Sequence, residues 1–130
     1  MILLDTHSLI WWVSNKEKLS AISKKKISSA ALSQSIYISS ISIWEIMLLD
    51  RKKKISLSMD ATTWLQQITT LPEITLKPID FEIAHLAATL DYPHKDPADR
   101  FILATAQSLA IPLITKDKHM HTYSQVETIW

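Results

Sequence analysis

The chain alternates between short, continuous hydrophobic runs and longer stretches in which hydrophobic residues recur every three or four positions. Short runs bounded by polar residues are typical of buried strands, whereas the longer spacing is typical of helices with one buried face. Strands are predicted at residues 2–4, 36–39, 74–76, 113–114 and 126–129. Because helical stretches separate these strands, we expect βα units. The pattern therefore predicts a layered α/β domain around a parallel sheet.

The helices are predicted in the stretches between the strands, at residues 6–13, 20–34, 42–52, 61–71, 81–90 and 97–110. Three of them follow an Asp, whose side chain accepts hydrogen bonds from the unpaired amides of a first helical turn. These N-cap residues are Asp60, Asp80 and Asp96. The expected buried faces of the second and third helices are Ile22, Ile27, Ala30 and Ala31, and Ile43, Trp44, Met47 and Leu48.

Length and composition indicate one globular domain. The chain has 130 residues, of which 47% are hydrophobic and 21% charged, and we expect a single domain spanning residues 1–130. No apolar run approaches the roughly 20 residues that a helix needs to cross a bilayer, so we expect no membrane association. No basic segment precedes the apolar residues 1–4, so we expect no secretory signal and a cytoplasmic location.

Two missing residue types exclude several kinds of site. Without Cys the chain forms no disulfide and offers no thiolate to a substrate or a metal. Without Gly it has neither a Walker-type phosphate loop nor a Rossmann fingerprint, both of which need backbone to approach phosphate closely. Any metal must therefore bind to oxygen or imidazole.

The net charge of +1 conceals an uneven distribution. Residues 16–54 hold nine Lys or Arg and three acids, a balance of +6, and the remainder holds five and ten, a balance of −5. A basic region beside an acidic one suits an enzyme that attracts a polyanion and binds cations where its chemistry occurs. This points to nucleic acid, with Lys52, Lys53 and Lys54 as candidate contacts, although a solvated helix end is the more frequent explanation for any single lysine.

Four acidic residues follow predicted strands, at positions that share one edge of a parallel sheet. Asp5 follows the first strand, Glu45 lies in the first turn of the helix after the second, and Asp117 follows the fourth. Asp99 lies in the first turn of the last helix. Functional crevices in such sheets lie outside the carboxyl ends of the strands. We therefore expect these four carboxylates to meet in one site.

Singly, each acid also has a structural explanation. Ser42 and Glu45 have the spacing of a capping box, in which the Glu returns to the N-cap amide. Asp96 precedes Pro97 as an N-cap, and Asp99 suits the positive end of the helix dipole. The joint arrangement, rather than any one residue, favours an active site.

Carboxylates that share a site repel one another unless a cation is present. Two unit charges about 4 Å apart cost roughly 4 kcal/mol at an effective dielectric constant of 20. Mg²⁺ or Mn²⁺ binds such hard oxygen ligands, keeps several waters, and activates one of them to attack phosphorus. Zn²⁺ usually recruits histidine, and the five histidines here show no clear ligand spacing. The acids therefore indicate a metal-dependent phosphodiesterase.

The chain resembles the PIN-domain ribonucleases, most closely the VapC-like toxins of type II toxin-antitoxin pairs. The resemblance covers nearly the whole chain and rests on ILLDTH, SISIWEI, HKDPADRFILATA and LITKD, in that order. It implies a three-layer α/β/α fold with a central, mainly parallel sheet. It also implies that Asp5, Glu45, Asp99 and Asp117 are the catalytic metal ligands. Asp96 is a further candidate, and the choice between Asp96 and Asp99 as the closer ligand stays open.

The resemblance further implies endoribonuclease activity on single-stranded or loop RNA, with Mg²⁺ or Mn²⁺ as cofactor and water as nucleophile. The products would carry 5′-phosphate and 3′-hydroxyl ends. Thr6 and Thr115 would orient carboxylates or water, and Arg100 would contact RNA phosphate, although a surface ion pair with Asp96 is the simpler interpretation. The implied partners are a VapB-like antitoxin and a second copy of the chain.

Three other functions compete with this one. A haloacid-dehalogenase-like phosphatase needs a second Asp two positions after the first, where this chain has His7. A response-regulator receiver needs adjacent acids after its first strand, and Asp5 stands alone. A catalytically inactive PIN-like module that binds RNA or an antitoxin is the more serious alternative.

Overall fold

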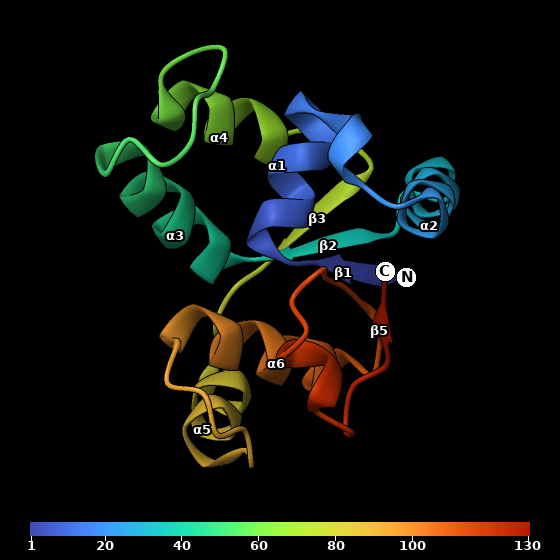
Figure 1. Cartoon of the computed structure of the whole chain (residues 1–130), viewed down its shortest axis with the longest axis vertical. Coiled ribbons are helices and arrows are strands. Elements are labelled where there is room, and N and C mark those ends of the chain that lie inside the picture. Colours follow the sequence, from blue (N-terminus) through green and yellow to red (C-terminus); the bar gives the residue numbers. More distant parts are fainter.

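A five-stranded parallel sheet forms the centre of the molecule (Figure 1). The computed structural model describes all 130 residues. The strands lie in the order β3-β2-β1-β4-β5. Their bounds are β1 Ile2–Leu4, β2 Ile36–Ser39, β3 Ile74–Lys77, β4 Leu113–Ile114 and β5 Thr128–Ile129. Every adjacent pair is parallel, as the alternation of strands and helices predicts.

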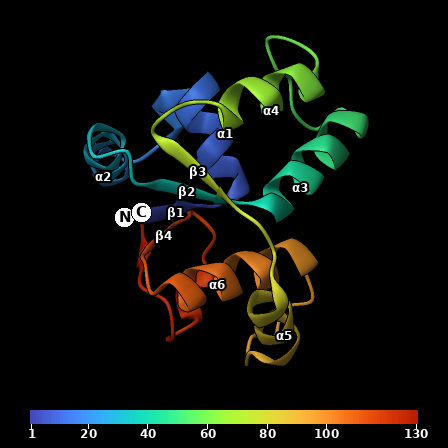
Figure 2. The same cartoon turned by 180° about the vertical axis from the view of Figure 1, so that it is seen from behind.

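Six helices cover the two faces of this sheet (Figures 1 and 2). Four lie on one face and two, α5 and α6, on the other. Their bounds are α1 Thr6–Ser14, α2 Ala21–Leu32, α3 Ser40–Arg51, α4 Ala61–Thr69, α5 Phe81–Thr89 and α6 Pro97–Leu109. The predicted three-layer α/β/α fold is confirmed. No helix is long and apolar enough to cross a membrane.

The layers follow from the alternation of side chains along each strand. Ile2 and Leu4 of β1 pack into the core beneath α1 to α4, whereas Leu3 between them packs into the core beneath α5 and α6. All three are buried, as are Ile36 and Ile38 of β2 and both residues of β4. Strands buried on both faces read as continuous apolar runs, which is why the sequence pattern predicts them so closely.

The predicted N-caps are present. The carboxylates of Asp60, Asp80 and Asp96 each accept a hydrogen bond from a backbone amide in the first turn of the helix that follows. Asp5 does the same for α1. The sequence places each of these helix starts within one residue of its position in the structure.

Two predicted helix faces are partly wrong. On α2, Ile22 is exposed and Ser23 is buried beside Ile27. On α3, Trp44 is 48% exposed, whereas Ile46 is fully buried. The helix begins at Ser40 behind a Ser39 cap, two residues before the predicted start. With three or more apolar residues on each side of α3, the sequence does not define which side faces the sheet.

Candidate active site

Asp5 and Asp117 extend from the carboxyl ends of the adjacent strands β1 and β4. Asp5 is 9% exposed, and its Oδ1 accepts a hydrogen bond of 2.8 Å from the Ser8 amide. The Asp117 amide donates to Thr115 Oγ1 at 3.1 Å, and its Oδ1 accepts from the His119 amide at 2.8 Å. Backbone contacts thus fix both carboxylates at the same edge of the sheet.

Glu45 and Asp99 reach this edge from helices α3 and α6. Glu45 lies in the second turn of α3, because the helix begins at Ser40. The predicted capping box with Ser42 is therefore wrong: Ser39 is the N-cap, and Ser42 Oγ lies 2.9 Å from Thr6 Oγ1 instead. Glu45 is left free to point into the site. Asp99, in the first turn of α6, is close to it.

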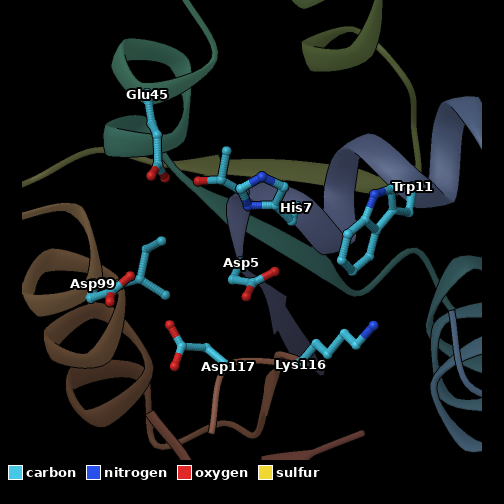
Figure 3. A pocket seen from close by; sticks show the side chains of 9 residues that line it. Asp5, His7, Trp11, Glu45, Asp99, Lys116 and Asp117 are labelled. Atoms are coloured by element: carbon cyan, nitrogen blue, oxygen red, sulfur yellow. The ribbon is translucent and has the colours of Figure 1, made fainter. Parts of the chain in front are cut away.

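These four acids surround one cavity of about 340 Å³ (Figure 3). Glu45 and Asp99 lie on one side of it, with Asp5 and Asp117 between them and the opposite wall (Figure 3). The complete lining is Asp5, Thr6, His7, Trp11, Glu45, Asp99, Ile102, Lys116 and Asp117. The structure thus brings together the four acids that the sequence predicts to share one site.

Asp96 lies outside this cavity. Its Oδ1 accepts hydrogen bonds from the amides of Ala98 and Asp99, at 2.9 and 3.4 Å, and so caps α6. Its side chain lines a separate hollow together with Trp44, Lys52 and Lys54. Of the two candidate acids in this segment, Asp99 is the one that lines the cavity with Asp5.

The electrostatics of the cavity reflect crowding of negative charge. Burial raises the pKa of Asp99 to about 7, assisted by the charges of Asp96, Asp117, Glu45 and Asp5. Burial also raises the pKa of Asp5, although hydrogen bonds from Thr115 and Ser8 lower it in part. Burial raises the pKa of Glu45 as well, and a hydrogen bond from Thr6 opposes that increase. Desolvated carboxylates that repel one another favour a proton or a cation among them.

The hydroxyls of Thr6 and Thr115 lie beside the carboxylates. Both residues are buried. Hydrogen bonds from them lower the pKa of Glu45 and Asp5 respectively, and so favour the charged carboxylates. Thr115 Oγ1 also accepts a hydrogen bond from the Asp117 amide. These contacts are those of groups that orient acidic side chains, which is the role we propose for them.

The pKa of Asp99 predicts how the metal-free protein responds to pH. Its ordinary value is 3.8, so between about pH 4 and pH 7 the folded state holds a proton that the unfolded state has released. This contribution to stability is complete below pH 4 and disappears as the pH rises to 7. We expect Asp99→Asn to remove that pH dependence, measured as the difference in unfolding free energy between pH 5 and pH 8. Asp91→Asn, an exposed change on the neighbouring loop, is the matched control, and equal slopes in both variants would contradict the assignment.

The donors around the cavity fit a hydrated Mg²⁺ or Mn²⁺. As placed, no three Asp, Glu or His side chains lie close enough together to bind one ion directly. Mg²⁺ is usually bound through one or two carboxylates, with waters and substrate phosphate completing its shell, so it does not need a closed protein cage. The negatively charged groups of the lining are all carboxylates, and repulsion among them helps to raise the pKa of Asp99. A divalent cation would relieve that repulsion.

Arg100 binds backbone carbonyls, and the predicted ion pair with Asp96 is absent. Its guanidinium donates to the carbonyls of Ala87, Leu90 and Tyr92, at 2.6 to 2.9 Å. All three nitrogens are thus engaged by the C-terminal end of α5 and the loop beyond it. The prediction differs because the sequence does not show that this turn folds back over α6, leaving carbonyls that need a donor.

Four residues of the cavity lining were missed from sequence: His7, Trp11, Lys116 and Ile102. Tyr92 lies outside the lining, and its hydroxyl is buried. The charges of Asp99, Asp117 and Asp96 add to burial in raising the pKa of Tyr92. Two signals point to the first three: His7 and Trp11 lie one turn apart on the helix that Asp5 caps, and Lys116 adjoins Asp117.

The sequence matches the family model described as "PIN domain" over residues 2–125. The chain belongs to the PIN-domain family. Among curated proteins, it is 31% identical over 133 residues to "Ribonuclease VapC22" of Mycobacterium tuberculosis, covering 99% of this chain and 98% of that one. The predicted family is thus confirmed.

Solved structures share the fold over nearly the full length of the chain. The FitAcB structure from Neisseria gonorrhoeae superposes with a TM-score of 0.70 at 22% identity, covering 100% of this chain and 97% of that one. VapBC2 from Rickettsia felis, bound to a DNA fragment from their promoter, gives a TM-score of 0.72 at 14% identity, covering 99% and 98%. At these identities the likeness supports the fold alone.

Proposed function

We propose that this PIN-domain chain is an endoribonuclease that hydrolyses phosphodiester bonds in RNA with the help of Mg²⁺ or Mn²⁺. The observation that carries the proposal is the convergence of Asp5, Glu45, Asp99 and Asp117 on one cavity. The 31% identity to a protein named as a ribonuclease supports the same reaction. The lining holds no Cys, Ser or Tyr side chain that could act as a covalent nucleophile, which favours attack by water.

Asp5, Asp99, Glu45 and Asp117 are the residues that would hold the cation. When bound, Mg²⁺ or Mn²⁺ offsets phosphate charge and lowers the pKa of water. Asp5 contributes a carboxylate that the Ser8 amide and Thr115 hold in place. In the metal-free chain the pKa of Asp99 is raised to about 7, and a bound cation would favour its charged form. Ile102 contributes apolar surface to the lining of the cavity.

We propose that the chain acts as the toxin of a toxin-antitoxin pair in the cytoplasm, with a VapB-like antitoxin as its partner. The supporting observation is that a solved structure from Klebsiella pneumoniae, with a TM-score of 0.64 to this chain, is described as a toxin-antitoxin complex. A homodimer, implied by the family resemblance, stays a prediction. Co-expression with the product of the adjacent reading frame, followed by purification of one tagged component, tests the partnership: co-purification supports it, and recovery of the tagged chain alone contradicts it.

The inactive module is the alternative to be excluded. The purified chain, incubated with end-labelled single-stranded RNA and Mg²⁺, should give fragments with 5′-phosphate and 3′-hydroxyl ends. These ends are tested by 5′-phosphate-dependent exonuclease digestion and by ligation. Binding of RNA without fragments in either metal would favour the module, and 2′,3′-cyclic phosphate ends would exclude hydrolysis by water.

The run of Lys52, Lys53 and Lys54 is predicted to bind RNA phosphate. All three lysines are exposed at the end of α3, and two of them border the hollow beside Asp96. Replacing the three with Ala should weaken RNA binding and reduce the slope of log affinity against log salt by up to about 0.7 for each phosphate that is no longer neutralised. The matched control is the triple Ala variant of Lys24, Lys25 and Lys26 on α2, which are equally exposed. If the salt slope is the same in both variants, Lys52, Lys53 and Lys54 have no specific role in RNA binding and are part of a solvated helix surface.

A further inference from the structure

The cavity has a second wall whose chemistry differs from that of the acids. Trp11 of α1 and Lys116, which follows β4, lie on the side away from Glu45 and Asp99, and His7 of α1 lies between Glu45 and Trp11 (Figure 3). Lys116 is the only Lys or Arg in the lining. The mechanism proposed above uses none of these three side chains.

Aromatic contacts hold the Trp11 ring in place. Trp130, near the C-terminus, packs edge-on against it, with ring centroids 5.8 Å apart and an angle of 63° between the planes. The His7 ring lies 5.6 Å away at 49°, and Lys116 Nζ lies 5.9 Å from the centroid of Trp11. Trp11 remains only partly buried. It is therefore a rigid aromatic surface that borders an open cavity, with a cation beside it.

This combination fits a nucleobase with its attached phosphate. Every base has a π-face that stacks on an aromatic side chain, and such stacking is the usual way in which single-stranded RNA is bound. A lysine ammonium beside the ring offers charge to the backbone phosphate. The acidic wall cannot supply that attraction, because its carboxylates repel phosphate until a cation is bound.

We propose that His7, Trp11 and Lys116 form a nucleotide subsite next to the scissile phosphate, in which Trp11 stacks on an unpaired base and Lys116 contacts the adjoining phosphate. The inference rests on the proposed ribonuclease function and adds to it that the substrate presents an unstacked base at the site. Double-stranded RNA does not present such a base, so the subsite selects single strands and loops.

The test separates the base from the backbone. The probes are a short single-stranded RNA of randomised sequence and a ribose-phosphate oligomer of the same length that lacks bases. Binding is measured by fluorescence anisotropy in the Asp99→Asn background, so that cleavage does not interfere. Trp11→Ala should weaken binding of the RNA by roughly tenfold or more and leave binding of the abasic oligomer unchanged, and Trp11→Phe should retain most of the affinity. Lys116→Ala should weaken binding of both probes.

Trp12→Ala is the matched control, because Trp12 neighbours Trp11, is partly buried against the same core and does not line the cavity. It should change the affinity for neither probe. Thermal unfolding of each variant confirms that it is folded, and Trp11→Phe provides the test if Trp11→Ala is not. In Trp11→Ala, equal decreases in affinity for both probes, or no decrease for either, would overturn the subsite.

The outcomes also separate this inference from the proposed function. If the chain cleaves RNA but Trp11→Ala shows no base-dependent decrease in binding, the proposed function stands and the subsite does not. If Trp11→Ala shows a base-dependent decrease in binding but the chain never cleaves RNA, the subsite stands and the proposed function does not.

Discussion

Removal of divalent cations with EDTA is expected to abolish RNA cleavage, and addition of Mg²⁺ or Mn²⁺ in excess of the chelator is expected to restore it. The reason lies in the cavity, where four acids face one another and burial with mutual repulsion raises the pKa of Asp99 to about 7. Without a cation this wall repels the phosphate that it must approach. The measurement is the single-turnover rate of cleavage of end-labelled RNA before and after chelation.

Two controls make this result specific. A metal-independent ribonuclease added to the same buffers shows that EDTA does not protect the RNA itself. Asp5→Asn protein, purified in parallel, shows how much cleavage comes from contaminating nucleases. If the wild type continues to cleave RNA at full rate in EDTA, the reaction does not depend on a metal, whatever the arrangement of the acids.

Asp5→Asn and Asp99→Asn are each expected to lower the single-turnover rate by about a hundredfold or more. A cation contributes several kcal/mol of charge stabilisation in the transition state, and each 1.36 kcal/mol corresponds to a tenfold change in rate. Both carboxylates line the cavity, and the amide that replaces each has nearly the same shape but no charge. The measurement is the rate at saturating enzyme and a fixed Mg²⁺ concentration.

Asp96→Asn is the matched control for Asp99→Asn. Asp96 lies three residues earlier on the same segment, caps α6 and lies outside the cavity. Because Asn caps a helix about as well as Asp, the variant should fold normally and keep a rate within about threefold of the wild type. A decrease in Asp96→Asn as large as that in Asp99→Asn would show that the two acids share the cation, and the assignment of Asp96 as a cap alone would be wrong.

Much of the fold could be predicted because parallel strands buried on both faces leave a clear sequence signal. The apolar runs at β1, β2 and β4 match the strands closely, and Asp60, Asp80 and Asp96 mark three helix starts. The convergence of Asp5 and Asp117 follows from the rule that carboxyl ends of parallel strands share an edge. For these residues, local sequence and the final fold impose the same arrangement.

The rest depends on choices that local sequence leaves open. Ser39, Ser40 and Ser42 are all suitable caps, so the start of α3, and with it the turn that carries Glu45, could not be assigned. The exposure of Trp44 follows from that same choice of register. The contacts of Arg100 depend on how the loop after α5 folds back, which is a tertiary feature.

The aromatic wall illustrates the same limit at longer range. Trp11, Lys116 and Trp130 come from the first helix, the loop after β4 and the end of the chain. Only the pairing of β1, β4 and β5 brings these segments together. No spacing within the sequence records that proximity.

Whether the four carboxylates form a metal site can be measured without any substrate, by titration with Mn²⁺ followed by electron paramagnetic resonance. Free Mn²⁺ gives a sharp signal that broadens on binding, so the titration needs no RNA and is not affected by contaminating nucleases. We predict saturable binding by the wild type, at least tenfold weaker binding by Asp5→Asn and Asp99→Asn, and little change in Asp96→Asn. Equal affinity for Mn²⁺ in the wild type and Asp5→Asn would show that these carboxylates are not a metal site.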